Sequence, residues 1–389
     1  MRRFARRVLV TLSEIGLRAL PTRRHAVIAG WPQTEANIIE LARELSGRDY
    51  PFVWLDAPSE HALVQYGFGA MPRCRALPKR SLRGYWSFLT AELVVFTHGL
   101  YGNPRPANGK TIVNVWHGEG PKRHVLKVGG GRALVPADYF VGASEIFAGL
   151  EAAGTGAADV LLCGQPRLTQ LGRDVPSAKL DELGIDPARP FVVWLPTYRQ
   201  STGTGLVSGW ADAEEPASGS LEDQFRSCLE QIVAAGAQVV FKMHPLDVLR
   251  FSIPGAVEVT DTDLADHGIG LYELIGAADA LVTDYSSVWV DYLQIDRPVA
   301  FLVPDEAEFM RGRGLEPADV MEHLPGPRLT VDTAFGFGEA VVNRTDHTRS
   351  MREHSIERFG IRRVHDPARQ LVDHLIDAQM MAPSTKAAV

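Results

Sequence analysis

The sequence predicts an α/β protein with two domains, each built on a parallel sheet. Short runs rich in Val, Ile, Leu and Phe alternate with helical stretches along most of the chain, as strands buried on both faces do. A stretch at residues 173–190 that carries Pro, Asp and Gly separates two such series. The length of 389 residues also favours two or three domains.

The first element is expected to be an amphipathic helix, MRRFARRVLVTLSEIGLRAL, which Pro21 ends. At 100° per residue, an arc of about 100° holds its apolar residues, namely Phe4, Ala5, Val8, Leu12, Ile15 and Ala19. The opposite side holds its arginines, namely Arg2, Arg3, Arg6, Arg7 and Arg18. A secretory signal is disfavoured because Glu14 and Arg18 interrupt the apolar region and no small-residue cleavage site follows.

This helix has two interpretations. It lies on an anionic membrane surface through Arg2, Arg3, Phe4, Arg6, Arg7 and Val8, or it docks its apolar face on the protein body. At about 1 kcal/mol per basic residue near such a surface, the four leading arginines give on the order of 4 kcal/mol. That is enough for reversible attachment only. No stretch approaches the ~20 apolar residues of a membrane span.

The expected strands form two series. The first comprises 25–30, 52–56, 93–98, 111–116, 138–143 and 159–164, and the second comprises 191–196, 238–243, 280–284 and 298–303. Helical patterns between or after them cover 221–235, 271–278, 286–295 and 366–381, and a surface loop is expected at 200–220. The expected organisation is an interfacial helix at 1–22, a Rossmann-like domain at 23–180, a second Rossmann-like domain at 181–365, and a C-terminal helix and tail at 366–389.

Polar residues follow five of these strands, where ligands of parallel α/β sheets bind. After the first-series strands come His117-Gly118-Glu119-Gly120-Pro121-Lys122-Arg123-His124 and Gln165-Pro166-Arg167. After those of the second series come Thr197-Tyr198-Arg199, His244-Pro245 and Tyr285-Ser286-Ser287. Five strand ends in order indicate a shared cleft that binds phosphate.

Candidate roles follow from residue type. His117 precedes a glycine and has Lys122, Arg123 and Lys127 close behind it, and cations keep a histidine neutral and able to act as a general base. Its alternative is a structural histidine. Ser286 and Ser287 open a helix with Asp284 or Ser286 as N-cap, which makes a phosphate site or merely a cap.

Three further positions remain open in the same way. Lys242 and His244 are phosphate donors or solvated strand-end residues, and Asp291 binds ribose hydroxyls or is a solvated acid. No metal site is evident, since H-E-x-x-H and strand-flanked D-x-D patterns are absent. Walker and G-x-G-x-x-G patterns are absent too, which argues against NTPases and dinucleotide oxidoreductases.

Charge is distributed unevenly along the chain. Residues 1–190 hold 24 basic and 17 acidic residues, a net +7, whereas residues 191–389 hold 16 and 30, a net −14. The basic front half is therefore expected to meet an anionic partner, which composition leaves open as nucleic acid, a membrane surface or a phosphorylated substrate. Nucleic acid is disfavoured because the basic stretch at 73–83 lacks interleaved aromatics. Three cysteines without metal spacing fit a reducing compartment.

The ordered motifs WHGEGPK, GQPR, LPTYR, KMHP, YELIGAADALVTDYSSVWVDYLQIDRPVAF and LPGP resemble the CDP-glycerol glycerophosphotransferase family of teichoic acid synthesis. The resemblance covers about residues 110–330 and is strongest at 271–303. It implies a GT-B fold, two Rossmann-like domains facing a central cleft, with no cofactor and no essential metal. The domain at 23–180 would meet the acceptor, and the domain at 181–365 would bind the CDP-alcohol. The resemblance also implies transfer of glycerol phosphate from CDP-glycerol to a lipid-linked glycan acceptor with release of CMP, at the cytoplasmic face of the membrane.

The resemblance places the donor at Gly118, Glu119, Gly120, Pro121, Arg167, Pro196, Thr197, Lys242, Met243, His244, Ser286, Ser287 and Asp291. His117 and His244 are the implied catalytic histidines, and Lys122, Arg123 and Arg199 supply phosphate electrostatics. The family often has a small hydroxyl residue and a proline where this chain has Glu119-Gly120, which leaves CDP-ribitol or another CDP-polyol as alternative donors. The chain also lacks the long N-terminal region of the large polymerases, which favours a compact, primase-like enzyme.

Two other functions compete with this one. A GT-B glycosyltransferase would use a nucleotide sugar for capsule or glycolipid synthesis, and a membrane-peripheral scaffold would keep the fold without catalysis. Retention of His117, Lys242, His244 and the serine pair argues against the scaffold.

Overall fold

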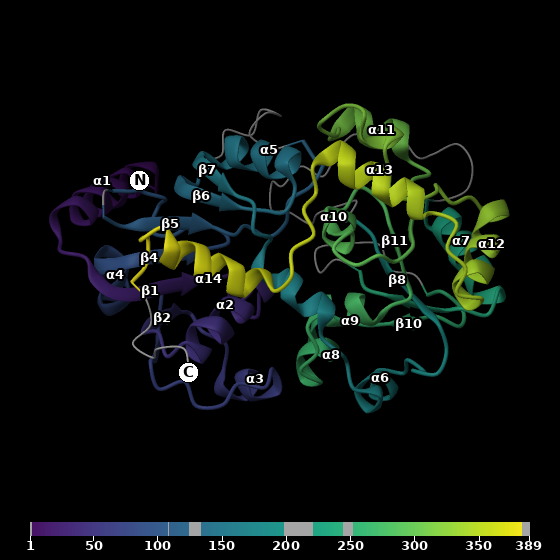
Figure 1. Ribbon diagram of the computed structural model, residues 1–389, viewed down its shortest axis with the longest axis horizontal. Helices are drawn as coiled ribbons and strands as arrows, with labels where there is room; N and C mark the ends of the chain where they lie inside the picture. Colours follow the sequence, from purple (N-terminus) through teal and green to yellow (C-terminus); the bar gives the residue numbers. More distant parts are fainter. Residues whose placement is uncertain (1, 108, 124–133, 198–220, 244–251, 383–389) are drawn as a thin grey trace. The chain divides into compact units, whose positions relative to one another are not determined.

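The computed structural model describes residues 2–107, 109–123, 134–197, 221–243 and 252–382. The chain forms two compact units, each built on one parallel sheet (Figure 1). Unit 1 comprises Met1–Glu119, His124–Gln170 and Arg362–Val389, and unit 2 comprises Gly120–Arg123 and Leu171–Ile361. The predicted α/β class with parallel sheets is therefore confirmed.

Unit 1 contains a seven-stranded sheet in the order β3-β2-β1-β4-β5-β6-β7. The strands are β1 (Arg23–Ala29), β2 (Phe52–Leu55), β3 (Cys74–Leu77), β4 (Ala91–Phe96), β5 (Thr111–Asn114), β6 (Ala137–Val141) and β7 (Ala157–Leu161). Alternate residues of β1 enter different cores: Ile28 packs with α2 (Ala36–Gly47), and Val27 packs near α4 (Leu82–Thr90). Both faces of the sheet are thus covered, which explains the continuous apolar strands.

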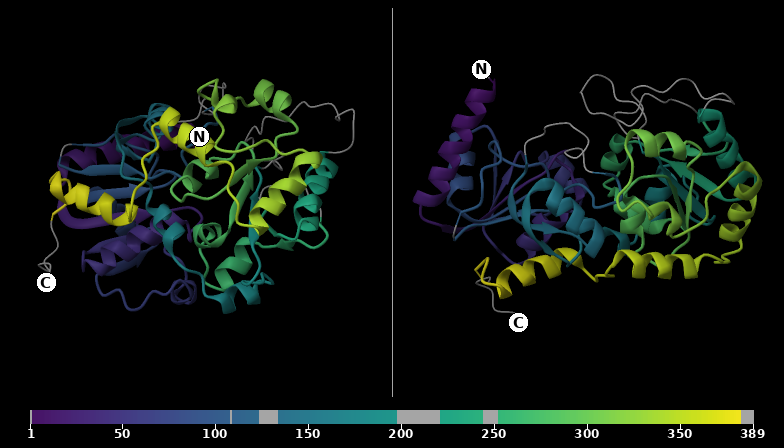
Figure 2. Two further views of the ribbon diagram at one scale, coloured as in Figure 1. Left: turned by 45° about the vertical axis from the view of Figure 1, so that its right-hand side comes forward. Right: turned by 90° about the horizontal axis from the view of Figure 1, so that it is seen from above.

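The C-terminal helix α14 (Pro367–Asp377) belongs to unit 1, whereas the sequence predicted a separate helix and tail. Leu371, Val372 and Leu375 are buried in the same core as Leu41 of α2. Their spacing forms an apolar helix face that needs a partner. Figure 2 shows α14 and α1 (Arg2–Ala19) on opposite sides of the sheet. The boundary between the units lies at 170/171, ten residues before the expected one.

Helix α1 docks on unit 1 through a face other than its apolar arc. Leu17 is 1% exposed, a Cβ on Gly16 would lie 2.9 Å from Leu89, and the Ser13 and Tyr85 hydroxyls are 3.0 Å apart. The predicted apolar arc faces outward, and its described large side chains are exposed, namely Phe4, Val8, Leu12 and Ile15. The alternative in which this arc docks on the protein body is therefore wrong. Among the described residues, no helix is both long and apolar enough to cross a membrane.

Unit 2 contains a five-stranded sheet in the order β10-β9-β8-β11-β12. The strands are β8 (Phe191–Leu195), β9 (Gln238–Phe241), β10 (Val257–Glu258), β11 (Ala280–Thr283) and β12 (Val299–Phe301). The helices described are α6 (Ser177–Glu182), α7 (Leu221–Ala234), α8 (Asp261–Asp266), α9 (Leu271–Ala277), α10 (Val288–Tyr292), α11 (Glu306–Gly312), α12 (Val331–Val342) and α13 (Arg349–Phe359). Close packing of α7 on α12 depends on Gly338, where a Cβ would lie 2.7 Å from Ala235.

All ten expected strands are present, and two short edge strands, β3 and β10, were missed. The expected linker at 173–190 contains helix α6, and the helix expected at 286–295 is limited to Val288–Tyr292. The remaining helices of unit 1 are α3 (Glu60–Gln65) and α5 (Glu145–Thr155). The expected surface loop at 200–220 lies outside the described residues.

A buried arginine ties α13 to the rest of unit 2. The Arg352 side chain is fully buried, and its guanidinium lies 2.7 Å from Asp296 and 2.6 Å from Asp346. These bonds lower the pKa of Asp346 to about 2. We expect Arg352→Met to destabilise the protein by about 1.5–3 kcal/mol, because charge-assisted hydrogen bonds to two partly exposed carboxylates are lost.

Urea unfolding would measure this loss, with Arg349→Met as the matched control. Arg349 lies one turn earlier and also contacts Asp296, at 3.4 Å, but 66% of its side chain is exposed. Its replacement should cost less than about 1 kcal/mol. Equal losses in the two variants would contradict the role of the buried guanidinium.

Candidate functional site

The carboxyl edge of the unit 1 sheet presents His117 on a constrained backbone. Strand β5 ends at Asn114, whose Oδ1 accepts the Trp116 N–H at 2.9 Å. Trp116 has a φ of 46°, a left-handed conformation that bulky residues rarely adopt. The exposed His117 ring stacks on His98, with centroids 4.6 Å apart and planes 8° apart, and its centroid lies 4.3 Å from the Trp116 ring. This backbone points an imidazole outward at the strand end.

His98 is a site residue that the sequence reading missed. It follows β4, and burial, with a smaller effect of Lys79, lowers its pKa to about 4. His98 is therefore neutral at neutral pH, and its Nδ1 lies 2.8 Å from the Thr97 hydroxyl. Its position at the end of the expected strand 93–98 was the available signal. The stack thus places an uncharged ring against His117.

Glu119 is fully buried, and its carboxylate lies at the N-terminus of α5. It accepts the backbone N–H groups of Ala143 and Ser144. A helix N-terminus is where a carboxylate is stabilised. Two backbone amides at this helix N-terminus therefore hold the Glu119 carboxylate.

Residues Gly120–Arg123 pack on unit 2, so the predicted motif is divided between the units. Gly120 approaches Ser287 closely, and a Cβ there would lie 2.4 Å from the Ser287 Cβ. Lys122 pairs with Leu315 in an antiparallel bridge, and the Arg123 N–H donates to the Gly314 carbonyl at 3.1 Å. The two cations therefore belong to a backbone segment of unit 2 beside Ser287.

The carboxyl edge of the unit 2 sheet is organised around Asp284, which is 2% exposed. Its carboxylate accepts the Thr197 N–H at 2.8 Å, the Thr197 hydroxyl at 2.8 Å and the Ser286 N–H at 3.1 Å. Asp284 is thus not the helix cap that the sequence suggested. Ser287 occupies the N-cap of α10 without a side-chain bond, and the Ser286 hydroxyl accepts from Val288 at 3.4 Å. The ends of β8 and β11 are joined here.

The other predicted donor residues of unit 2 have polar partners or lie nearby. Lys242 is 9% exposed and its Nζ lies 2.9 Å from the Asp261 carboxylate. Asp291 is 1% exposed and accepts a hydrogen bond from the Tyr272 hydroxyl at 2.5 Å. It is therefore not a solvated acid. Pro196 and Met243 are half-buried beside Thr197 and Lys242 in sequence.

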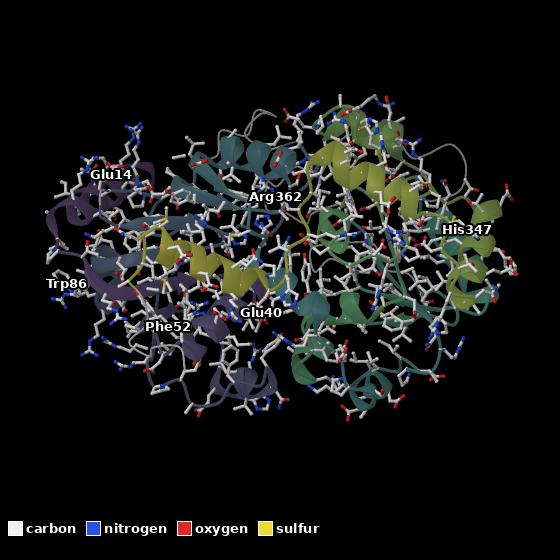
Figure 3. The ribbon with its side chains drawn as sticks, viewed as in Figure 1. Glu14, Glu40, Phe52, Trp86, His347 and Arg362 are labelled. Atoms are coloured by element: carbon white, nitrogen blue, oxygen red, sulfur yellow. The ribbon has the colours of Figure 1, made fainter. Side chains whose placement is uncertain are left out.

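Each predicted site residue can now be assigned to a unit. Unit 1 holds His117, Gly118, Glu119 and Arg167, and unit 2 holds Gly120, Pro121, Lys122, Arg123, Pro196, Thr197, Lys242, Met243, Ser286, Ser287 and Asp291. Arg199 and His244 lie outside the described residues. In Figure 3, the labelled residue Glu40 belongs to α2, the helix that follows β1 in unit 1.

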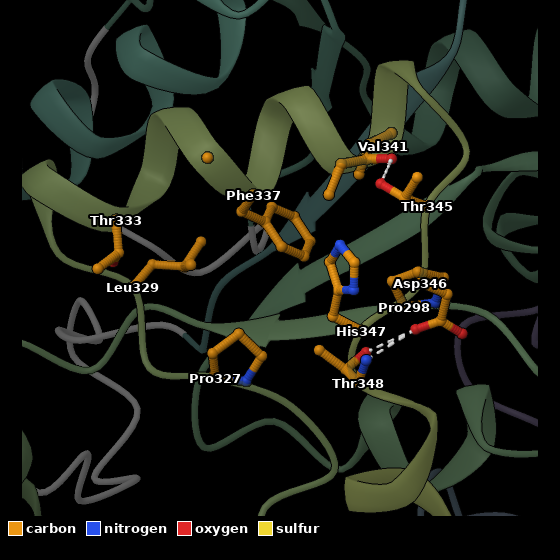
Figure 4. Close-up of a pocket in the computed structure, with 12 residues that line it drawn as sticks. Pro298, Pro327, Leu329, Thr333, Phe337, Val341, Thr345, Asp346, His347 and Thr348 are labelled. Atoms are coloured by element: carbon orange, nitrogen blue, oxygen red, sulfur yellow. Dashed lines mark hydrogen bonds between the residues drawn. The ribbon is translucent and has the colours of Figure 1, made fainter.

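Two cavities of unit 2 contain none of the predicted site residues. One, of about 240 Å³, lies between α12 and the start of β12, with Phe337 and His347 in its mostly apolar lining (Figure 4). The other, of about 490 Å³, lies at the starts of β8 and β11. Both are at the amino ends of strands, whereas ligands of parallel sheets bind at the carboxyl ends. Within the described residues, no group of three or more His, Cys, Asp or Glu could hold a metal ion.

A protein family model and a known relative both match this chain. The family model of CDP-Glycerol:Poly(glycerophosphate) glycerophosphotransferase matches residues 32–359. The teichoic acid poly(glycerol phosphate) polymerase of Bacillus spizizenii is 29% identical over 288 residues, which are 65% of this chain and 66% of that protein. The chain thus spans just under two thirds of that relative's length.

Solved structures give the fold. A variant of the wall teichoic acid polymerase TagF soaked with CDPG has a TM-score of 0.68 at 19% identity, covering 96% of this chain and 94% of its own. A putative UDP-N-acetylglucosamine 2-epimerase from Listeria monocytogenes has a TM-score of 0.53 at 13% identity, covering 95% and 100%. At these identities the likeness shows the fold alone. The likeness to TagF confirms the predicted GT-B-like class.

Proposed function

Because the chain belongs to the CDP-glycerol:poly(glycerophosphate) glycerophosphotransferase family, we propose that it transfers glycerol phosphate, or a related polyol phosphate, from a CDP-polyol to a lipid-linked glycan acceptor. The reaction serves the synthesis of teichoic acid or a related cell-surface polymer and releases CMP. The observation that carries the proposal is the family match over 32–359, which includes every described candidate residue at the two sheet edges.

His117 is the proposed general base. Its ring is exposed at a strand end, stacked on a neutral His98, which supports a group that meets substrate. An acceptor hydroxyl loses its proton to His117 as its oxygen attacks the phosphorus next to glycerol. A new P–O bond forms, the P–O bond to the CMP phosphate breaks, and CMP leaves with that electron pair. Such a base contributes about 10²–10⁴-fold in rate.

Unit 2 is proposed to bind the donor. Ser286 and Ser287 supply hydroxyl groups at the end of β11, where Asp284 holds Thr197 and the Ser286 backbone in place, and Lys122 and Arg123 add positive charge next to Gly120. Fixed donors of this kind stabilise the negative charge that develops on transferred phosphate. Contacts of Asp291 with ribose and of His244 and Arg199 with phosphate belong to the same proposal.

A donor screen tests the proposal. The purified protein is mixed with CDP-glycerol, CDP-ribitol, UDP-sugars or GDP-sugars and a lipid-linked acceptor analogue, and nucleotide release is measured. We expect CMP from a CDP-polyol. Turnover of UDP- or GDP-sugars instead would support the alternative, a GT-B glycosyltransferase, and would overturn the proposal.

We further propose that α1 holds the enzyme on the cytoplasmic face of the membrane. Phe4 is 74% exposed, Leu12 56% and Ile15 57%, all on one side of a helix whose other side is docked. Apolar side chains at this spacing, flanked by arginines, suit the interface of an anionic leaflet. A membrane position would also bring the enzyme to a lipid-linked acceptor.

Replacing Phe4, Leu12 and Ile15 together with serine is expected to abolish sedimentation with vesicles of phosphatidylglycerol and phosphatidylcholine. Burial of their side chains supplies roughly 1.5–3 kcal/mol each. These substitutions leave the docked residues Gly16 and Leu17 intact, which deletion of residues 2–20 would not.

Leu82→Ser is the matched control, because Leu82 is also an exposed leucine of unit 1, at 89% exposure, but lies on α4. It should leave sedimentation unchanged. Binding of the triple variant at the wild-type level would exclude α1 as the membrane contact.

A further inference from the structure

Asn37 uses its whole side chain to connect three segments at the carboxyl edge of unit 1. The residue is fully buried in the first turn of α2. Its Nδ2 donates to the Trp116 carbonyl at 3.2 Å and to the Glu35 carboxyl at 3.0 Å, and its Oδ1 accepts the Arg167 N–H at 3.0 Å. An amide offers two donor hydrogens and one acceptor oxygen, and here all are used.

Glu35 is the third partner of this amide. It is 9% exposed, caps α2 by accepting the Ile38 N–H at 3.2 Å, and accepts from Asn37. Burial raises its pKa to about 7, against the opposing charge of Arg167. The Trp116 carbonyl only accepts and the Arg167 backbone N–H only donates, so the Asn37 NH₂ group must face Trp116 and its oxygen must face Arg167 in either protonation state of Glu35.

The backbone that Asn37 contacts is under strain. Trp116 has a φ of 46°, and such a conformation costs of order 1–3 kcal/mol unless its surroundings impose it. Two asparagine side chains impose it here: the Trp116 N–H donates to Asn114, and the Trp116 carbonyl accepts from Asn37. His117 is the next residue, so the direction of its imidazole depends on both bonds.

We propose that Asn37 is a positioning residue that fixes the Trp116–His117 backbone and the Arg167 backbone relative to each other. The catalytic consequence rests on the function proposed above. Asn114 also fixes the Trp116 backbone, independently of Asn37. In the bonds described it contacts Trp116 but neither Arg167 nor Glu35. Loss of either asparagine should release His117, whereas only loss of Asn37 should disturb Arg167.

The variants are Asn37→Ala and Asn114→Ala, with Gln170→Ala as the matched control. Gln170 is also a buried amide, 1% exposed, and its Nε2 donates to Glu40 at 2.9 Å. It joins the same two elements as the Asn37–Arg167 bond, namely α2 and the 3₁₀ helix η2 (Pro166–Gly172). It therefore controls for the loss of a buried hydrogen bond in this part of the fold.

Two measurements on the full chain test the proposal. In protein labelled with ¹³C at the histidine Cε1, the His117 signal, assigned by its loss in His117→Gln, should shift in Asn37→Ala and Asn114→Ala but not in Gln170→Ala. With CDP-glycerol and acceptor, kcat should fall about 10- to 100-fold in the two asparagine variants. In Asn114→Ala the donor KM should stay within about 2-fold of wild type, because Arg167 keeps its contact.

An unshifted His117 signal in folded Asn37→Ala would overturn the proposal, as would equal effects in Gln170→Ala. If wild-type protein releases no CMP, the function proposed above fails, but the histidine signal still decides whether Asn37 positions His117. If Asn37→Ala does not fold, the isosteric Asn37→Asp, which keeps an acceptor for the Arg167 N–H but has no NH₂ group for the Trp116 carbonyl, decides by the same shift.

Discussion

Replacing His117 with alanine is expected to reduce turnover of CDP-glycerol by at least about 10²-fold, because the acceptor hydroxyl loses its general base. The exposed ring contributes contacts to His98 and Trp116 rather than a buried core, so the thermal midpoint should change little. Affinity for the donor, measured by calorimetry with CDP-glycerol, should also stay near wild type. The effect therefore appears in kcat.

His61→Ala is the control, because His61 is another exposed histidine of unit 1, lies on α3 and belongs to none of the candidate motifs. It should retain full turnover. If His117→Ala retained near-normal activity with the same acceptor, His117 would not be the base, and its stacking on His98 would be a structural contact only.

The strands could be predicted because their burial on both faces leaves a continuous apolar run. Val192, Val193 and Trp194 of β8, for example, are all buried, and so are their neighbours. Strands β3 and β10 could not be predicted in this way. They are edge strands, and β3 keeps Arg75 and Ala76 exposed, so its composition resembles that of a loop.

The candidate site was predictable where a single residue type follows a strand, as with His117, Thr197 and Ser286. It was not predictable where the role depends on a partner far along the chain. Asn37 contacts Arg167, 130 positions away, and Glu119 binds amides of Ala143 and Ser144, about 25 positions away. Local sequence patterns contain no trace of such pairs.

The direction in which the apolar arc of α1 faces could not be predicted from the sequence either. Periodicity identifies an apolar face, but it does not say whether protein or another phase covers that face. Docking through Ser13, Gly16 and Leu17 uses two small residues for close approach and only one large apolar side chain. That face does not stand out in a hydrophobicity pattern, so the sequence alone could not decide whether the apolar arc of α1 docks on the protein or faces outward.

Replacing Asp284 with alanine is expected to lower both stability and donor affinity. The carboxylate is 2% exposed and accepts the N–H and hydroxyl of Thr197 and the N–H of Ser286. A buried donor without an acceptor costs about 1–3 kcal/mol, so the loss of these bonds should lower the free energy of unfolding by more than about 3 kcal/mol. Chemical denaturation would measure it.

The matched control is Thr283→Val. Thr283 also joins β11 to β8, through its hydroxyl and the Leu195 carbonyl at 2.7 Å, but it is the last residue of β11 and lies one position before Asp284. Its replacement should cost about 1 kcal/mol and leave binding of CDP-glycerol unchanged. Comparing Thr283→Val with Asp284→Ala therefore separates the effect of weaker contact between β8 and β11 from the effect of losing the Asp284 carboxylate.

The affinity for CDP-glycerol shows whether Asp284 organises a donor-binding site. If Thr197, Ser286 and Ser287 hold the donor phosphates, Asp284→Ala should weaken CDP-glycerol binding at least about 10-fold, since one bidentate acceptor sets the positions of both strand ends. The double change Ser286→Ala and Ser287→Ala should weaken binding as well, with little effect on stability, because Ser287 makes no capping bond and the Ser286 bond is long, at 3.4 Å. If the Asp284→Ala protein were destabilised yet bound CDP-glycerol normally, Asp284 would serve only to connect β8 and β11, and the donor would bind elsewhere on unit 2.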